Sequence, residues 1–169
     1  VTDDRQGGYD ACAFLLGKGC KRLCGIFKSD DMQGLARYAG MMAALRERRA
    51  AVSDDRLMWF ATGELARALE HALPQALRDC DGVVCYNDEV AVALINRLKE
   101  EGVRVPEDMA VISFDNSDYA ALAGVPITSL EHPKEKLGTL AAQKLIHLMD
   151  GEGETPSVMP WGFSKKRST

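Results

Sequence analysis

The chain has 169 residues, 46% of them apolar and 27% charged, which is the ordinary balance of a globular protein with room for one sizeable core. Its formal net charge is −4 and its basic residues cluster only at 165–167, so this chain by itself is a poor candidate for binding DNA. No apolar run approaches the roughly 20 residues of a membrane span, and we expect no membrane contact.

The first residues, VTDDRQGGYDA, lack the basic and apolar regions of a signal peptide. They also lack an initiator methionine, and we interpret this start as a cut inside a longer protein. Five cysteines form an odd set with no CxxC pair and no histidine at metal-ligand spacing: Cys12, Cys20, Cys24, Cys80 and Cys85. The favoured interpretation is buried, reduced thiols in a cytoplasmic protein, with neither metal nor cofactor.

Strand and helix patterns alternate along the chain. In its first half, the expected elements are a helix at 8–17, a strand at 22–27, a helix from about 33 to 49, a strand at 56–60 and a helix from 62 or 63 to about 77. In its second half, they are a strand at 82–86, a helix between Asn87 and Gly102, a strand at 109–114, a short helix or turn at 117–122, an extended run at 126–130, a helix at 134–149 and a last extended segment. This alternation predicts an α/β fold with a doubly wound parallel sheet.

Two glycines, Gly7 and Gly8, precede the first helical pattern. Glycines that open a helix could cradle a phosphate, but the GxGxxG spacing of such sites is absent. Close packing or a turn is therefore the favoured reason for them.

Residues 81–118 form the strand–helix–strand unit around which the rest of the chain is organised. Asn87 follows the first of its strands and Asp115 follows the second. Open α/β sheets bind ligands at the carboxyl ends of their parallel strands, so we expect the chemistry of the protein at this edge. A carboxylate accepts from two vicinal hydroxyls and an amide both donates and accepts, which suits a hydroxyl-rich ligand. Capping of the following helix is a strong alternative for Asn87 and a weaker one for Asp115.

Three further positions are candidates for the same site. Arg37 lies in the first turns of its helix, where a cation gains nothing from the helix dipole, and a ligand role and a surface position explain it equally well. His132 precedes a proline in a loop after a strand, where it could reach a cleft, although a lone histidine more often pairs with a neighbour. Phe60 or Tyr86 could stack on the apolar face of a sugar, whereas core packing is the commoner use of such rings.

Motifs of common catalytic sites are absent from the sequence. No serine, histidine and aspartate occur around a recognisable nucleophile elbow, and neither a P-loop nor an HExxH motif is found. We therefore expect a binding protein and not an enzyme.

Several runs of sequence carry a family resemblance. They include GLARYAGMMAAL, VVCYNDEVAVALINRLKEEGVRVPEDMAVISFDNSD, PITSLEHPKEKLG and the final KKRST. Together they resemble, over nearly the whole chain and in the same order, the effector-binding domain of lactose- and galactose-repressor-type transcription regulators, which are similar to periplasmic sugar-binding proteins. GIFKSDDMQG and SLEHPKEKLG look most like the arabinose-metabolism repressor branch, in which a winged-helix DNA-binding domain precedes the sugar-binding domain.

The resemblance implies ligand-binding roles for individual residues. It matches Arg37 to the arginine that binds sugar hydroxyls in the family, and Asn87 and Asp115 to the two ligands at strand ends. It places His132 at a common polar position of the pocket and Phe60 at an aromatic wall position.

Family members begin this domain with further strand–helix units that are missing here. The resemblance therefore implies a periplasmic-binding-protein-like domain of two lobes, of which this chain holds mainly the C-terminal one. Residues from about 20 to 130 and 155–169 would form the complete lobe. Residues 1–19 and 131–150 would be remnants of the other lobe.

The function that the resemblance implies is sensing of an arabinose-like sugar by a cytoplasmic transcription repressor, which then alters its hold on operator DNA. The DNA-binding winged helix would lie outside this chain. A homodimer is expected through apolar positions of the central helix and the turn after the next strand: Val90, Ala93, Leu94, Tyr119 and Leu122. The alternatives are a transport-type periplasmic sugar-binding protein and a small α/β enzyme.

Overall fold

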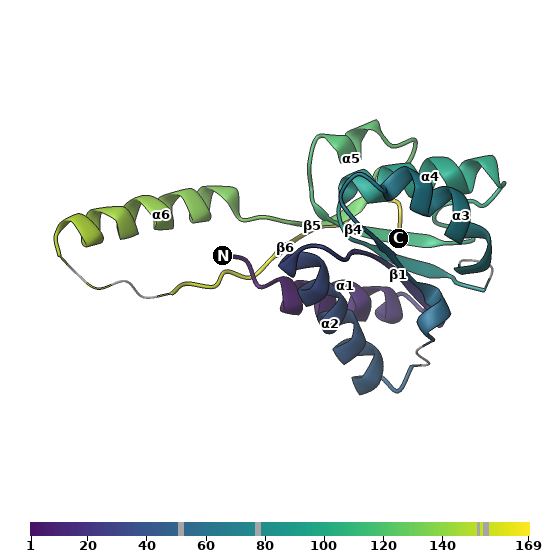
Figure 1. The fold of residues 1–169 in the computed structure, drawn as a ribbon, viewed down its shortest axis with the longest axis horizontal. Helices are drawn as coiled ribbons and strands as arrows, with labels where there is room; N and C mark the ends of the chain where they lie inside the picture. Colours follow the sequence, from purple (N-terminus) through teal and green to yellow (C-terminus); the bar gives the residue numbers. More distant parts are fainter. Residues whose placement is uncertain (51–52, 77–78, 152, 154–155) are drawn as a thin grey trace.

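A mostly parallel sheet forms the centre of the molecule (Figure 1). The computed structural model describes residues 1–50, 53–76, 79–151, 153 and 156–169, and the side chains of residues 71–76 and 121–122 lie outside that description. Within the described residues the sheet has six strands in the order β2–β1–β3–β4–β5–β6. Its first five strands are parallel and β6 is antiparallel to β5, which confirms the predicted α/β class.

The elements follow the predicted alternation closely. The strands are β1 Leu23–Lys28, β2 Leu57–Phe60, β3 Gly82–Cys85, β4 Ala110–Asp115, β5 Thr128–Glu131 and β6 Gly162–Ser164. The helices are α1 Asp4–Gly17, α2 Met32–Glu47, α3 Leu65–Ala76, α4 Asp88–Glu100, α5 Tyr119–Leu122 and α6 Lys134–Met149, with a short 3₁₀ helix η1 Asp54–Arg56 before β2. The predicted end of α3 near residue 77 lies outside the described residues.

Helices cover both faces of the sheet, with α1 and α2 on one side and α3, α4 and α5 on the other (Figure 1). Successive residues of the central strands therefore enter two different apolar cores. Val83 packs into the core that includes residues of α4, whereas Val84 packs into the core that includes residues of α1 and α2. Because both faces are covered, every residue of β3 is buried, as expected for a central parallel strand.

The helix α1 packs on the same core as α2, although the sequence analysis expected residues 1–19 to be a remnant of another lobe. Three of its side chains are buried in the core beside α2: Ala11, Cys12 and Leu15. Glycine permits the close contact between the two helices, since a Cβ atom on Gly8 would lie 2.0 Å from the carbonyl oxygen of Arg37. Close packing is thus the reason for Gly8, and the helix begins earlier than predicted because Asp3 caps it by accepting from the amide of Gln6.

In contrast, α6 projects away from the rest of the molecule (Figure 1). None of its side chains, all of which the structure describes, is buried. Large apolar side chains stand in solvent along it, among them Met149 with 79% and Leu145 with 60% of their surface exposed. Such a face needs a partner surface, since soluble proteins rarely leave contiguous apolar area in water.

The last residues of the chain hydrogen-bond to both β4 and β5 near the amino ends of these two strands. Ser168 is fully buried, and its hydroxyl donates to the carbonyl of Val111 at 2.6 Å and accepts from the amide of Thr128 at 2.8 Å. Its own amide donates to the carbonyl of Pro126 at 3.1 Å, and its carbonyl accepts from the amide of Val111 at 2.7 Å. The segment that follows β6 is therefore part of the core.

The predicted dimer surface is wrong for two of its residues. Val90 and Leu94 are buried in the core between α4 and the sheet, so they are not available to a second subunit. Ala93 is partly buried and Tyr119 is 58% exposed, while the side chain of Leu122 lies outside the described residues. Helical spacing alone did not separate the face of α4 that packs on the sheet from the face that meets solvent.

The cysteines are thiols, as expected. Four of them are buried (Cys12, Cys24, Cys80 and Cys85), Cys20 is partly buried, and none forms a disulfide. Burial raises the pKa of the Cys12 thiol to about 12, which leaves it protonated at neutral pH. In the described parts of the chain, no helix is both long and apolar enough to cross a membrane.

Candidate functional site

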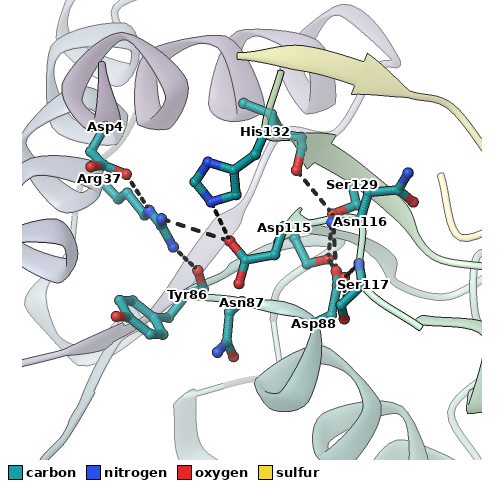
Figure 2. A network of polar contacts seen from close by, with 12 residues as sticks. Asp4, Arg37, Tyr86, Asn87, Asp88, Asp115, Asn116, Ser117, Ser129 and His132 are labelled. Atoms are coloured by element: carbon teal, nitrogen blue, oxygen red, sulfur yellow. Dashed lines mark hydrogen bonds and ion pairs between the residues drawn. The ribbon is translucent and has the colours of Figure 1, made fainter. Parts of the chain in front are cut away.

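Three predicted side chains from separate elements meet at the carboxyl edge of the sheet (Figure 2). Arg37 comes from α2, Asp115 ends β4, and His132 follows β5. The Asp115 carboxylate joins them, because its Oδ1 lies 3.2 Å from Nε2 of His132 and 4.0 Å from Nη2 of Arg37. The sheet thus brings together residues that are far apart in the sequence.

Arg37 is a cation that the surrounding chain holds almost entirely out of water, with 2% of its surface exposed. Its Nε donates to the carboxylate of Asp4 at 2.9 Å, and its Nη1 donates to the carbonyl of Tyr86 at 2.5 Å. A buried charge is tolerated only when it is paired and hydrogen-bonded, and these two contacts also fix the guanidinium plane. The remaining nitrogen, Nη2, is the one nearest to Asp115. A simple surface position for Arg37 is therefore excluded.

Trp161 forms part of the wall of this site, although the sequence analysis did not single it out. Its ring centre lies 4.1 Å from that of His132 and 5.3 Å from that of Phe114. The guanidinium carbon of Arg37 lies 5.1 Å from the Trp161 ring centre and 4.3 Å from the Phe114 ring centre, within the range of a cation–π contact. The only signal in the sequence was a tryptophan in an extended segment, which core packing explains equally well.

Asp115 combines an unusual backbone with an unusual carboxyl group. Its φ is +94° and that of Asn116 is +44°, a region that L residues rarely adopt and that is common at functional sites. Burial raises the pKa of the Asp115 carboxyl, the neighbouring Arg37 and His132 act to lower it, and the negative charge of Asp88 raises it further. The net result is a raised pKa, which is typical of residues in binding and catalytic sites.

Asp88 is a second carboxylate, buried beneath the turn at 115–117, with 1% of its surface exposed. It accepts from the backbone N–H of Ser117 at 2.6 Å and from the hydroxyl of the same residue at 3.0 Å. The hydroxyl of Ser129 donates to it at 2.9 Å, and the hydroxyl of Ser113 also donates to it. Four donors from three elements therefore satisfy this carboxylate (Figure 2).

Asn116 links the site to the end of the chain. Its side-chain nitrogen donates to Oε2 of Glu131 at 2.8 Å, and its side-chain oxygen accepts from Nζ of Lys166 at 2.8 Å. Since Glu131 precedes His132 directly, this chain of contacts ties both strand ends of the site to the final segment.

The other two predicted residues, Asn87 and Phe60, lie apart from this cluster. The side-chain oxygen of Asn87 accepts from the backbone N–H of Val90 at 3.1 Å and so caps α4. Figure 2 shows its side chain pointing away from Asp115. Phe60 is buried and meets the ring of Tyr86 edge-on, with ring centres 5.9 Å apart. In this structure Asn87 therefore acts as a helix cap and Phe60 packs in the core, which are the local alternatives that the sequence analysis left open.

Two hollows border the site residues. One, of about 460 Å³, is lined by Asp115, His132 and Glu131 among others. The other, of about 570 Å³, is lined by Asn87 and Phe60 among others. Both volumes fall in the range of small-molecule sites, so each is large enough for a ligand of sugar size. Within the described residues, no group of three or more histidine, cysteine, aspartate or glutamate side chains is placed to hold a metal ion.

A comparison with known families matches residues 12–169 to the periplasmic binding protein-like domain. This chain belongs to that family. The match includes every strand of the sheet and both helical layers, and it confirms the periplasmic-binding-protein-like fold that the sequence predicted.

Named relatives of this periplasmic binding protein-like domain are transcription regulators. The arabinose metabolism transcriptional repressor of Halalkalibacterium halodurans is 36% identical over 155 residues, which cover 89% of this chain and 41% of that protein. The repressor of the same name from Geobacillus stearothermophilus is 34% identical over 153 residues, which cover 88% of this chain and 42% of that protein. The chain thus spans about two fifths of the length of these relatives.

Solved structures of similar fold include two that hold sugars. The transcriptional regulator CelR in complex with cellobiose has a TM-score of 0.88 at 28% identity, and the match covers 99% of this chain and 53% of that one. A LacI family transcriptional regulator from Enterococcus faecium with bound ribose has a TM-score of 0.81 at 28% identity, covering 99% of this chain and 63% of that one.

Proposed function

We propose that this domain is the effector-binding part of a transcription repressor and that it binds a sugar of the arabinose type. The observation that carries the proposal is the convergence of Arg37, Asp115 and His132 at the carboxyl edge of a parallel sheet. The names of the two repressors and the sugars in the two similar structures support it.

The chemistry of the site suits a polyhydroxylated ligand. The Asp115 carboxylate accepts hydrogen bonds, while Arg37 has only donors, so vicinal hydroxyls can satisfy both at once. The ring of Trp161 beside His132 offers an apolar surface for the C–H face of a sugar ring. Of the five residues predicted from the sequence, Arg37, Asp115 and His132 are the ones that we propose as direct ligands. Asn87 and Phe60 line the other hollow. They would contact the same ligand only if it spans both hollows or if a movement brings the two hollows together.

The mechanism requires a second lobe, and α6 indicates where it attaches. Residues 134–149, which form α6, contribute no buried side chain to the lobe described here, and this supports the proposal that they pack on chain outside it. Of the predicted remnant at 131–150, Glu131 instead belongs to β5. A sugar held between two lobes binds the closed arrangement more tightly than the open one and so shifts the population toward closure. In the full-length protein this shift would alter the affinity of a winged-helix domain for its operator.

The remaining parts of the proposal concern partners and location. We propose a cytoplasmic homodimer that binds DNA through the winged-helix domain and does no chemistry on its ligand. With Val90 and Leu94 buried, Ala93 and the exposed Tyr119 are the residues of the predicted contact that stay available to a partner.

Titration calorimetry of the full-length protein with L-arabinose tests this function. Asp115→Ala and Arg37→Ala each remove hydrogen bonds to a charged group worth about 1.5–3 kcal/mol, so each should weaken binding more than tenfold. DNA binding without sugar should persist in both variants, because neither residue belongs to the DNA-binding domain.

Asp118→Ala is the matched control for these variants. Asp118 lies three residues from Asp115 in the same loop, is exposed, and makes no capping hydrogen bond to α5. It should bind L-arabinose like the wild type. Unchanged affinity in both Asp115→Ala and Arg37→Ala would refute the site, and the absence of any sugar response in the wild type would refute the function.

A further inference from the structure

The turn at 115–117 holds two consecutive non-glycine residues at positive φ, Asp115 at +94° and Asn116 at +44°. Such a backbone costs free energy and persists only where the surrounding structure enforces it. The contacts that hold this turn therefore decide where the Asp115 carboxylate points.

The hydrogen bonds that hold the turn end on the carboxylate of Asp88. The amide of Ser117 donates directly to Asp88 Oδ2 at 2.6 Å. The amide of Asn116 donates at 2.9 Å to the hydroxyl of Ser129, and that hydroxyl donates in turn to Asp88 Oδ1 at 2.9 Å. Both backbone N–H groups that follow Asp115 are thus fixed by one carboxylate, either directly or through a single hydroxyl.

The position of Asp88 suits a rigid anchor. It is the first residue of α4, where the helix N-terminus favours a negative charge, and 1% of its surface is exposed. Its donors are neutral amide and hydroxyl groups from the turn, β4 and β5. A buried carboxylate with only such partners is costly to maintain, and an apolar contact would hold α4 to the sheet without that cost.

We propose that Asp88 is a positioning residue, which sets the Asp115 carboxylate toward Arg37 and His132 and makes the affinity of the site for sugar depend on the packing of α4. This inference rests on the function proposed above. Within the described residues, the hydrogen bonds of the Asp88 carboxylate go to Ser113, Ser117 and Ser129, and not to Arg37, Asp115 or His132. A change at the buried end of α4 would therefore reach the ligand through the turn at 115–117.

Asp88→Asn in the full-length protein is the decisive variant. An amide has the size of the carboxylate but cannot accept at both atoms, so it would set an N–H donor against one of the existing donors. We expect affinity for L-arabinose to fall at least tenfold while the circular dichroism of the unliganded protein is unchanged. Glu100→Gln, at the exposed end of the same helix, is the control and should bind like the wild type.

Two ligand-free measurements test whether the influence of Asp88 reaches Asp115 and the turn at 115–117. The charged groups that face Asp115 are Arg37 from α2, His132 after β5 and Asp88 from α4. Carboxyl-carbon NMR of Asp88→Asn should therefore give a lower pKa for Asp115 than in the wild type. The amide of Ser117 should lose protection from hydrogen exchange, whereas amides of β3 should keep theirs.

Each outcome bears on the inference. Affinity within twofold of the wild type in a folded Asp88→Asn protein, or an unchanged Asp115 pKa together with unchanged Ser117 exchange, would overturn it. If Asp88→Asn does not fold, Ser129→Ala removes the link from Asn116 and should still weaken binding severalfold, and normal binding by that variant would overturn the inference. If the wild type binds no sugar, the proposed function fails, while the two ligand-free measurements still decide the role of Asp88.

Discussion

The Asp115 carboxyl lies in surroundings that disfavour its charged form, and its pKa is raised. Burial acts to raise the pKa of its carboxyl, and the attraction of Arg37 and His132 does not fully offset that effect. The folded domain therefore binds the Asp115 proton more tightly than the unfolded chain does. The stability that comes from this group is complete below the ordinary aspartate pKa and is lost as the pH rises through the raised value.

Asp115→Asn should consequently separate binding from stability. The amide cannot ionise, so we expect the unliganded variant to unfold at pH 7 at a temperature equal to or above that of the wild type, with the difference shrinking as the pH falls toward about 4. Sugar binding should be lost at the same time. Thermal unfolding between these pH values, with Asp118→Asn as control, measures the effect. A variant that melts well below the wild type at pH 7 would show instead that the Arg37 pair supports the fold.

At the scale of single residues, the sequence pointed to Asp115 as a candidate but not to Asp88, which holds the turn that carries it. The strand end marks Asp115, because a polar residue follows a run of buried apolar ones. Asp88 follows Asn87 and looks like one more polar residue at a helix start. Its hydrogen-bond partners lie 25 to 41 residues further along the chain, and no local sequence pattern predicts them. Asn87 has a family role and a local role as a cap; the structure contains the cap, and the ligand role stays a prediction.

At the scale of elements, the contact between α1 and α2 is what places Arg37. Gly8 lies against the Arg37 carbonyl, and Gly40, one turn along α2, lies against Arg5, where a Cβ atom would be 1.9 Å from the carbonyl oxygen. Side chains at either position would push the helices apart. The same contact brings Asp4 within reach of the Arg37 guanidinium.

Gly8→Ala should therefore weaken both the fold and the site. Overpacking of a close contact typically costs about 1–3 kcal/mol, and a shift of the α2 backbone would move Arg37 with it. Gly17→Ala is the control, because it lies in the same helix and nothing lies within 4 Å of its added Cβ atom. Urea unfolding should show the loss for Gly8→Ala alone. Equal stability of the two variants would mean that the helices separate without cost.

The order of helices and strands could be predicted from the sequence. Which surface each helix packs against was harder to predict. Buried β-branched runs and helical spacing predicted the strands and helices because both reflect burial in two covered layers. The pattern could not say what α1 packs against, since the glycines that allow its close contact with α2 have their partners on a distant helix. It also could not tell that Val90 and Leu94 face the sheet and not a partner subunit.

At the scale of the whole molecule, the exposed apolar side chains of α6 indicate that a second lobe is missing. The ligand site would then have only one of its two walls in this chain. The residues proposed to bind sugar lie on one lobe, and α6 extends beyond it (Figure 1). A ligand on a single wall keeps its other face in water and gains few preorganised partners.

The 169-residue chain alone should therefore bind L-arabinose far more weakly than the full-length protein. A ligand well above its dissociation constant raises the unfolding temperature, and we expect no such rise for this chain at millimolar sugar but a clear one for the full-length protein. Scanning calorimetry of both proteins is the measurement. Binding by this chain in the micromolar range would show that the pocket is complete within these residues.

The burial of Ser168 has a consequence for the order of events during synthesis. A ribosome delivers the chain from its amino end, so the segment around Ser168, which hydrogen-bonds to Val111 and Thr128, is the last of the described residues to emerge. Until then Lys166 cannot reach Asn116, and the turn that carries Asp115 lacks one of its contacts. A nascent chain should thus form most of its sheet before the proposed ligand site has all of its contacts.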